Sequence, residues 1–460
     1  MVSERAERHL RLTGEAALRR ALTPPLGAAR GRSPDVVTHP LRRLQWAAAA
    51  LTAVGAVDAR RAETIADEFA TALSLRQLSP AATRPMFRTG LVSPAGGPGA
   101  AAPAAPPPRV IPVGRMLRFR GDNGSGELYL MSLVVTGDQA AVPALARFRP
   151  GERKAGAFLR QPYPAFEAMT AADDQGTTYQ VVPVGGAMRP GWTGSLNIVP
   201  APPAGALWLE LSGGDPGSVR IDLGALAAAA AAHAVTAGPL SAPPAERLLE
   251  NMVQHTLAAA EFPAMARDTA DGVGDVVAAL TAAGALSPFS AMPGQLATVC
   301  ERLGITDHGI AGRPAAALPE PWLSVLACYG RRHPPAIRDG VAAVAAGLPG
   351  MDGAQITLAG LHTLRGQTFL HVFGRGLAQA LPSQRLGAYP PFGWWLRDDA
   401  SHWHVVVQRH WEQHVADGEG PIELRVVPPL GPETGSGILF VTTRTEQASV
   451  RVPLAWWATP

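Results

Sequence analysis

The stretches ALTAVGAV (residues 50–57) and ALTAAGAL (residues 279–286) are nearly identical, although 229 positions separate them. In each stretch, apolar residues at helical spacing precede a glycine, Gly55 or Gly284, at the place where a left-handed residue ends many helices. Asp58 then suits the N-cap of a second helix. These features predict a helical hairpin over residues 41–79 and raise the question of how much more of the chain repeats.

Four further pairs of phrases recur in the same order, at offsets of 225 to 231 residues. They are YPAF from 163 and YPPF from 389, DDQGTTYQVV from 173 and DDASHWHVVV from 398, LNIVPAPP from 196 and LRVVPPL from 424, and SVRIDL from 218 and SVRVPL from 449. One such match would carry no weight, but five in register predict an internal duplication.

From residue 110 the apolar period changes from helical spacing to two, and short apolar runs alternate with Gly- and Pro-rich turns. Such a pattern is typical of an antiparallel β-sandwich. We therefore expect an α+β protein that is an internally duplicated helical head plus β-sandwich. The expected order is a basic flexible arm (1–40), the helical hairpin (41–79), a Pro/Ala/Gly linker (80–109), a sandwich (110–223), a second helical region (224–352) and a second sandwich (353–457).

The charge distribution argues against nucleic acid as a partner. Residues 1–45 hold nine Arg against four carboxylates, whereas the rest of the chain is nearly neutral. The basic residues are interrupted by Glu and by the helix-breaking run TPPLGAARGRSP, which favours a solvated arm over a nucleic-acid contact.

The cysteines and the apolar runs favour a cytoplasmic protein without a membrane span. Cys300 and Cys328 are the only cysteines, and neither belongs to a CxxC motif. A disulfide framework is therefore not expected. The longest apolar run, from Leu223, is mostly alanine and contains His233. Alanine is too weakly apolar for this run to be a convincing span. The oligomeric state is not determined by these features.

The densest polar cluster lies in SHWHVVVQRHWEQH, which holds four candidate metal ligands. They are His402, His404, His410 and His414. In a strand His402 and His404 share one face, and the alternate residues Trp403 and Val405 should be buried. We expect the two histidines to face solvent, where they could share a zinc ion if His410 or His414 folds back. No other cofactor is indicated.

Tryptophans gather in the same region and suggest a different site. Trp394, Trp395 and Trp411 could form an aromatic platform of the kind that stacks sugars. Core packing is the competing explanation, because alternation turns one residue of each adjacent pair inward. The paired carboxylates Asp173–Asp174 and Asp398–Asp399 are interpreted as turn-forming residues before a strand.

The phrases WWLRDDASHWHVVVQRHW, IELRVVPPL and GILFVTTRTEQASVRVPLAW, with the head LTAVGAVDARRAETIADEF, resemble a group of uncharacterised actinobacterial proteins. The resemblance implies the helical head and strand-rich domain and implies no activity. We expect a non-enzymatic binding or scaffolding protein with an unidentified protein partner. The alternatives are a metal-dependent enzyme or metal-binding protein that uses the histidine cluster, and a Trp-lined glycan-binding module.

Overall fold

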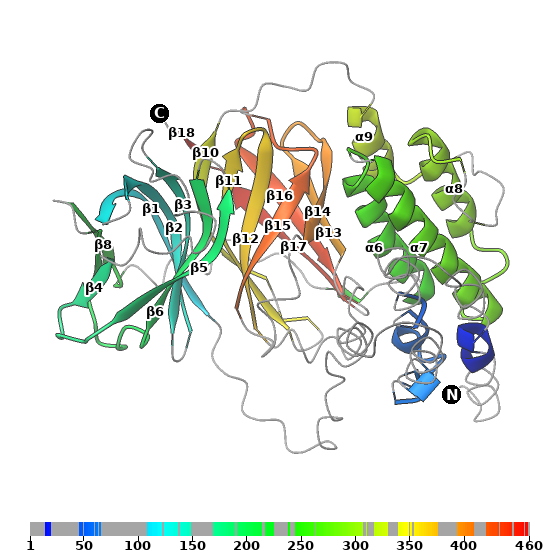
Figure 1. Cartoon of the computed structure of the whole chain (residues 1–460), viewed down its shortest axis with the longest axis horizontal. Helices are drawn as coiled ribbons and strands as arrows, with labels where there is room; N and C mark the ends of the chain where they lie inside the picture. Colours follow the sequence, from blue (N-terminus) through cyan, green and yellow to red (C-terminus); the bar gives the residue numbers. More distant parts are fainter. Residues whose placement is uncertain are drawn as a thin grey trace, which may run out of the picture.

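The computed structural model defines a strand-rich chain with a separate group of helices (Figure 1). The residues that it describes are 14–19, 46–48, 50–58, 60–62, 64–65, 108–121, 124–136, 139–148, 169–188, 191–213, 217–224, 238–239, 244–261, 263–306, 310, 317–329, 339–348, 350–351, 354–375, 393–408, 420–431, 433–443, 446–454 and 456–458. The residues that the structure describes are 47% strand and 28% helix, and their strands pair antiparallel. The predicted α+β class is confirmed at this level.

The helices form one body, which we call the helical body. Its long helices are α6 (Pro244–Ala258), α7 (Pro263–Ala282), α8 (Met292–Arg302) and α9 (Glu320–Tyr329). Helical residues between 46 and 65 pack into the same apolar core, so the two expected heads are joined. Residues 14–19, expected in a flexible arm, are also helical, and Leu18 is buried in this core. The rest of the expected arm and nearly all of the linker lie outside the described residues.

The two repeated glycines end their helices in the same way. Gly55 has a φ of 73° and Gly284 a φ of 72°. After Gly55, Ala56 N donates to Leu51 O at 2.8 Å, and after Gly284, Ala285 N donates to Leu280 O at 2.9 Å. This is the Schellman arrangement, in which glycine avoids the strain of a left-handed backbone. Asp58 caps the next helix, because its Oδ1 accepts from Arg60 N at 2.9 Å.

The first set of strands, which we call module 1, contains β1 to β8. Their bounds are β1 (Arg109–Gly121), β2 (Gly124–Val135), β3 (Ala140–Phe148), β4 (Thr170–Asp173), β5 (Gln180–Met188), β6 (Gly191–Val199), β7 (Trp208–Ser212) and β8 (Ser218–Asp222). They pair in the orders β1-β2-β3-β6-β5 and β4-β7-β8.

The second set, module 2, contains β10 to β18. Their bounds are β10 (Gly340–Gly347), β11 (Gln355–Leu364), β12 (Gln367–Arg375), β13 (Gly393–Asp398), β14 (Trp403–Gln408), β15 (Gly420–Val427), β16 (Ser436–Thr442), β17 (Glu446–Pro453) and β18 (Trp456–Ala458). With β9 (Gly238–Pro239) they form one sheet in the order β18-β10-β11-β12-β15-β14-β13-β16-β17-β9.

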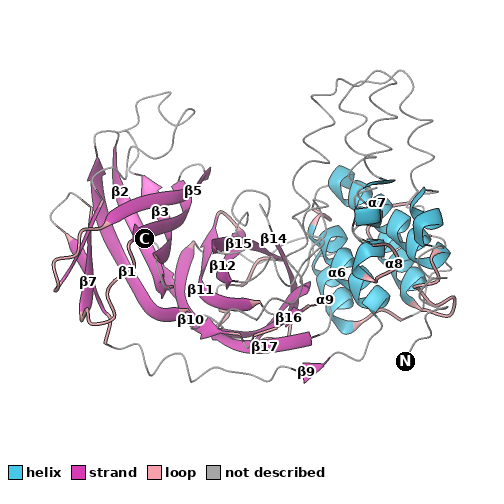
Figure 2. Ribbon diagram, turned by 90° about the horizontal axis from the view of Figure 1, so that it is seen from below, coloured by secondary structure: helices cyan, strands magenta, loops and turns pink. Residues whose placement is uncertain are grey.

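Module 2 differs in two ways from the sequence expectation. Its strands form one nearly closed, barrel-like sheet, where two facing sheets of a sandwich were expected. The curvature of the sheet is visible in Figure 2. Its first strand, β10, also lies within the range expected to be helical, 224–352. β10 is a short run, GVAAVAAG, in which alanine predominates, and alanine favours a helix, so the sequence does not distinguish this strand from a helix.

The two modules share strand neighbours and register. If β1–β8 are matched to β10–β17 in order, the neighbours in both modules follow the sequence 1-2-3-6-5-4-7-8, with a break between β5 and β4 in module 1. Asp173 pairs with Leu209, and the matching pair is Asp398 with Gly437. Ala140 pairs with Ile198, and the matching pair is Thr368 with Val426. Both modules also carry a cis proline at the same place, Pro200 and Pro428.

The modules pack against each other through the outer faces of β1–β3 and β10–β12. One small core joins Val134 and Ala141 of module 1 to Ala359 and Phe373 of module 2, and a second joins Met131 to Val341 and other residues. At the edge, Arg147 Nη2 lies 3.1 Å from Asp339 Oδ2. The contact is therefore an apolar joint with a polar border.

The helical body packs against the opposite side of module 2 (Figure 1). Trp395, Val405 and Val427 of the sheet belong to the same core as the helices. Trp403 N donates to Ser324 Oγ of α9 at 2.9 Å, and Trp394 N donates to Gln254 Oε1 of α6 at 3.0 Å. Module 2 thus lies between module 1 and the helical body. No described helix is long and apolar enough to cross a membrane.

The close packing between the modules predicts that one methyl group added at Gly360 lowers the stability of the protein. A Cβ at Gly360 of β11 would lie 2.6 Å from Met131 Cβ and 2.7 Å from its Sδ. We expect Gly360→Ala to lower the free energy of unfolding by about 1–3 kcal/mol through overpacking. Gly347→Ala in β10, where a Cβ meets nothing within 4 Å, is the control. Urea unfolding that shows equal stability for both variants would contradict the close packing.

Candidate functional site

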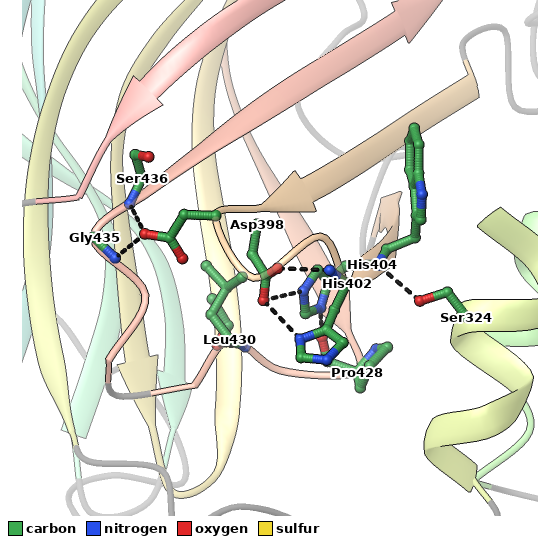
Figure 3. A network of polar contacts seen from close by, with 11 residues as sticks. Ser324, Asp398, His402, His404, Pro428, Leu430, Gly435 and Ser436 are labelled. Atoms are coloured by element: carbon green, nitrogen blue, oxygen red, sulfur yellow. Dashed lines mark hydrogen bonds and ion pairs between the residues drawn. The ribbon is translucent and has the colours of Figure 1, made fainter. Parts of the chain in front are cut away.

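The predicted metal region is organised by Asp398, at the end of β13. Its Oδ1 accepts from His402 N at 2.7 Å, which closes the turn into β14. Its Oδ2 lies 3.3 Å from His402 Nδ1 and 3.5 Å from His404 Nε2. Figure 3 shows both imidazole rings directed at this one carboxylate. Both histidines are therefore held by Asp398 in a turn.

His404 is buried, with 3% of its surface exposed. Its Nδ1 lies 2.6 Å from Pro428 O, and because a carbonyl only accepts, Nδ1 donates in this hydrogen bond. Burial alone would raise the pKa of Asp398, but the contacts from His404 and His402 outweigh burial, and the pKa is lowered. The ionised carboxylate is thus the form that this turn stabilises.

The same turn exists in module 1 with different side chains. Asp173 Oδ2 accepts from Thr177 Oγ1 and from Tyr179 Oη, both at 2.7 Å. By the shared register, Thr177 and Tyr179 match His402 and His404. A hydroxyl or an imidazole at these two places therefore performs the same task of holding the aspartate.

The second aspartate of each pair links the turn to the neighbouring hairpin. Asp174 Oδ1 accepts from Leu207 N at 2.8 Å in module 1. Asp399 Oδ2 accepts from Gly435 N at 2.8 Å and from Ser436 N at 2.9 Å in module 2, as Figure 3 shows. The turn-forming interpretation is confirmed for Asp173 and Asp398, whereas Asp174 and Asp399 bind backbone groups of a hairpin that is distant in the sequence.

The structure describes two of the four predicted metal ligands, His402 and His404. His402 is exposed and Val405 is buried, as expected, and Trp403 is half-buried. The expectation that His404 faces solvent is wrong, because β14 is covered on both sides. Val405 contacts the helical body, and Val406, on the face of His404, contacts the interior of module 2. His410 and His414 lie outside the described residues, so their part in a metal site stays a prediction.

The proposed aromatic platform is not supported at the two tryptophans that the structure describes. Trp394 is 5% exposed and lies in the interior of module 2, and Trp395 is 6% exposed and lies against the helical body. Trp395 meets Trp403 edge-to-face, with ring centroids 6.3 Å apart. Trp394 and Trp395 are therefore both core residues, because both faces of the sheet that carries them are covered. Trp411 lies outside the described residues.

A different polar cluster was missed by the sequence reasoning. His362, His371 and Glu423 bring candidate ligand atoms within 4.8 Å of one another. A signal existed in LHTLRGQTFLHVF, where two histidines flank a tight turn centred on Gly366, a glycine with a φ of 74°. Glu423 could not be assigned to this cluster from the sequence, because β15, which carries it, pairs with β12 although the two strands are far apart in the chain.

Comparison with known proteins assigns no relatives. No family model matches the chain, and no curated protein or solved structure matches it. The fold and the site must therefore be interpreted from their own geometry.

The Asp173 turn predicts a pH-dependent contribution to stability. Burial alone would raise the pKa of Asp173, but hydrogen bonds from Thr177, Tyr179 and Gln175 lower it to about 2. A lowered folded pKa gives stability that is present above the unfolded pKa, near 3.9, and lost as the pH falls through about 2. Asp173→Asn should therefore cost about 1–3 kcal/mol at pH 7 and progressively less below pH 4.

Urea unfolding from pH 7 to pH 2 measures this difference between the wild type and Asp173→Asn. Asp222→Asn is the control, because Asp222 is exposed and its Oδ1 accepts from Gly224 N outside the turn. A difference between wild type and Asp173→Asn that stays constant over the whole range would contradict the assignment.

Proposed function

We propose that the chain is a duplicated, non-enzymatic binding protein whose module 1 holds a helical partner. The origin by duplication is supported by the shared strand order and register of the modules and by the matching glycine caps of their helices. In this view the ancestral unit was a helical head followed by one module.

The face of module 2 under the helical body indicates what such a module binds. This face is apolar and is covered by helices. Its residues are Trp395, Trp403, Val405, Val407, Val427 and Phe440. Ser324 of α9 and Gln254 of α6 add hydrogen bonds to the backbone of the sheet, at Trp403 N and Trp394 N. A helix surface is therefore the natural occupant of this face.

The equivalent face of module 1 is exposed and is not covered by any helix that the structure describes. The matching residues by register are Thr170, Thr178, Gln180, Val182, Val199 and Ser212. All but the half-buried Ser212 are exposed, with Val182 at 37% and Val199 at 43%. Two exposed valines among hydroxyl and amide groups make this face about as polar as ordinary protein surface. Non-obligate interfaces have a similar polarity, so the face suits a partner that binds and dissociates.

This one observation carries the functional proposal: the helix-binding face of module 2 has an exposed, more polar counterpart in module 1. Module 2 and its helical body then act as the rigid support, and module 1 presents the binding face. The partner is a protein with an exposed helix that offers a few apolar residues and polar neighbours. We place it in the cytoplasm, a reducing compartment that suits Cys300 and Cys328, which form no disulfide.

Site-specific photo-crosslinking in cells tests the proposal. A photoreactive amino acid at Gln180, at the centre of the proposed face, should crosslink to one other protein through a helical segment. The same residue at Arg118, which is exposed on β1, is the control and should not capture that protein. Adding Val182→Asp and Val199→Asp should reduce the crosslink by tenfold or more at unchanged melting temperature, because both side chains are exposed.

Two outcomes would overturn the proposal. Equal capture of the same protein from Gln180 and Arg118 would show that the contact is not specific to the face. Crosslinks only between copies of this chain would make the face a self-association surface.

A further inference from the structure

A second site is formed on the outer face of module 2, by β11, β12 and β15. His371 of β12 lies directly across from Glu423 of β15, and it also pairs with Gly360 of β11, two residues from His362. His362 Nδ1 and His371 Nε2 are 2.8 Å apart. With Glu423, the candidate ligand atoms all lie within 4.8 Å of one another.

The surroundings hold these three side chains in place. His362 stacks on Phe369, with ring centroids 4.9 Å apart and planes at 21°. Both histidines are buried, and Glu423 is half-buried. Glu423 Oε2 accepts from Thr193 Oγ1 at 2.8 Å, and Thr193 belongs to β6 of module 1. The cluster therefore lies where the two modules meet.

The cluster is particular to module 2. The residues that match His362, His371 and Glu423 by register are Val134, Pro143 and Ser195. Valine and proline offer no ligand atom, so the fold does not require this set of side chains. In this respect the cluster differs from the Asp398 turn, whose counterpart in module 1 has the same hydrogen-bonded form.

We propose that His362, His371 and Glu423 bind one divalent transition-metal ion, with Zn²⁺ as the best match. Two imidazoles and one carboxylate are a recurrent ligand set for such ions and leave a position for water. Metal–ligand bonds near 2.0–2.1 Å place tetrahedral ligand atoms about 3.3 Å apart, so the two rings need to separate by only about half an ångström.

One contact prepares the site for a cation. The hydrogen bond from Thr193 fixes the orientation of the Glu423 carboxylate, as partners of metal ligands commonly do. Through Thr193 the ion would also strengthen the joint between the modules.

Zinc titration of the metal-stripped full-length protein tests the proposal, by calorimetry and by elemental analysis after dialysis. The wild type should bind about one zinc ion per chain and melt at higher temperature with zinc, because the ion binds the folded state. Glu423→Gln should remove this binding and the zinc-dependent rise in melting temperature. Glutamine keeps an oxygen that can accept from Thr193, so this variant should fold.

Three further variants sharpen the result. His371→Ala should also abolish binding, and Thr193→Val should weaken it by about tenfold or more. Asp222→Asn removes an exposed carboxylate outside both candidate metal sites and is the control, which should bind zinc as the wild type does. Wild-type protein that binds no zinc, or zinc binding that survives both Glu423→Gln and His371→Ala, would overturn the proposal and leave the pair as a buried hydrogen bond between histidines.

Discussion

The close packing of the β1–β3 face against the β10–β12 face is the constraint on which the remaining structure depends. Small residues such as Ala359 and Gly360 let the two sheets approach until Met131 contacts the backbone of β11. The contact removes one outer face of each module from solvent. It leaves module 2 a single outer face for the helical body, and it leaves the corresponding face of module 1 exposed.

The sheet of module 2 is covered on both faces, and this coverage explains which features could be predicted from the sequence and which could not. Gly55, Gly284, Asp58, Asp173 and Asp398 act within a few residues of themselves, so their roles follow from local chemistry. The second aspartate of each pair accepts from a backbone N–H more than 30 residues away, which local chemistry does not predict. The prediction that His404 is exposed assumed that one face of its sheet contacts solvent. That face is instead the interior of module 2, and the other face lies under helices that the sequence could not place.

Comparison of matched positions separates side chains that the fold needs from those that it does not. Asp173 and Asp398 occupy the same turn with different donors, so the carboxylate is common and the donor is replaceable. His371 and Glu423 of module 2 occupy the positions of Pro143 and Ser195 in module 1, and these two pairs of side chains have no structural role in common. The exposed threonines and valines of module 1 likewise replace a helix-covered apolar face. Functional differences between the halves are therefore expected at these two places.

The rigid joint between the modules can be measured directly by pulsed electron paramagnetic resonance. Nitroxides at Ser218→Cys of module 1 and Gln447→Cys of module 2, both exposed positions, report the separation of the modules. Cys328 must be replaced by serine, whereas Cys300 is protected, because burial raises the pKa of its thiol to about 12. The account predicts one narrow distance distribution, unchanged by dilution. A broad distribution would show that the modules move independently and would contradict the joint.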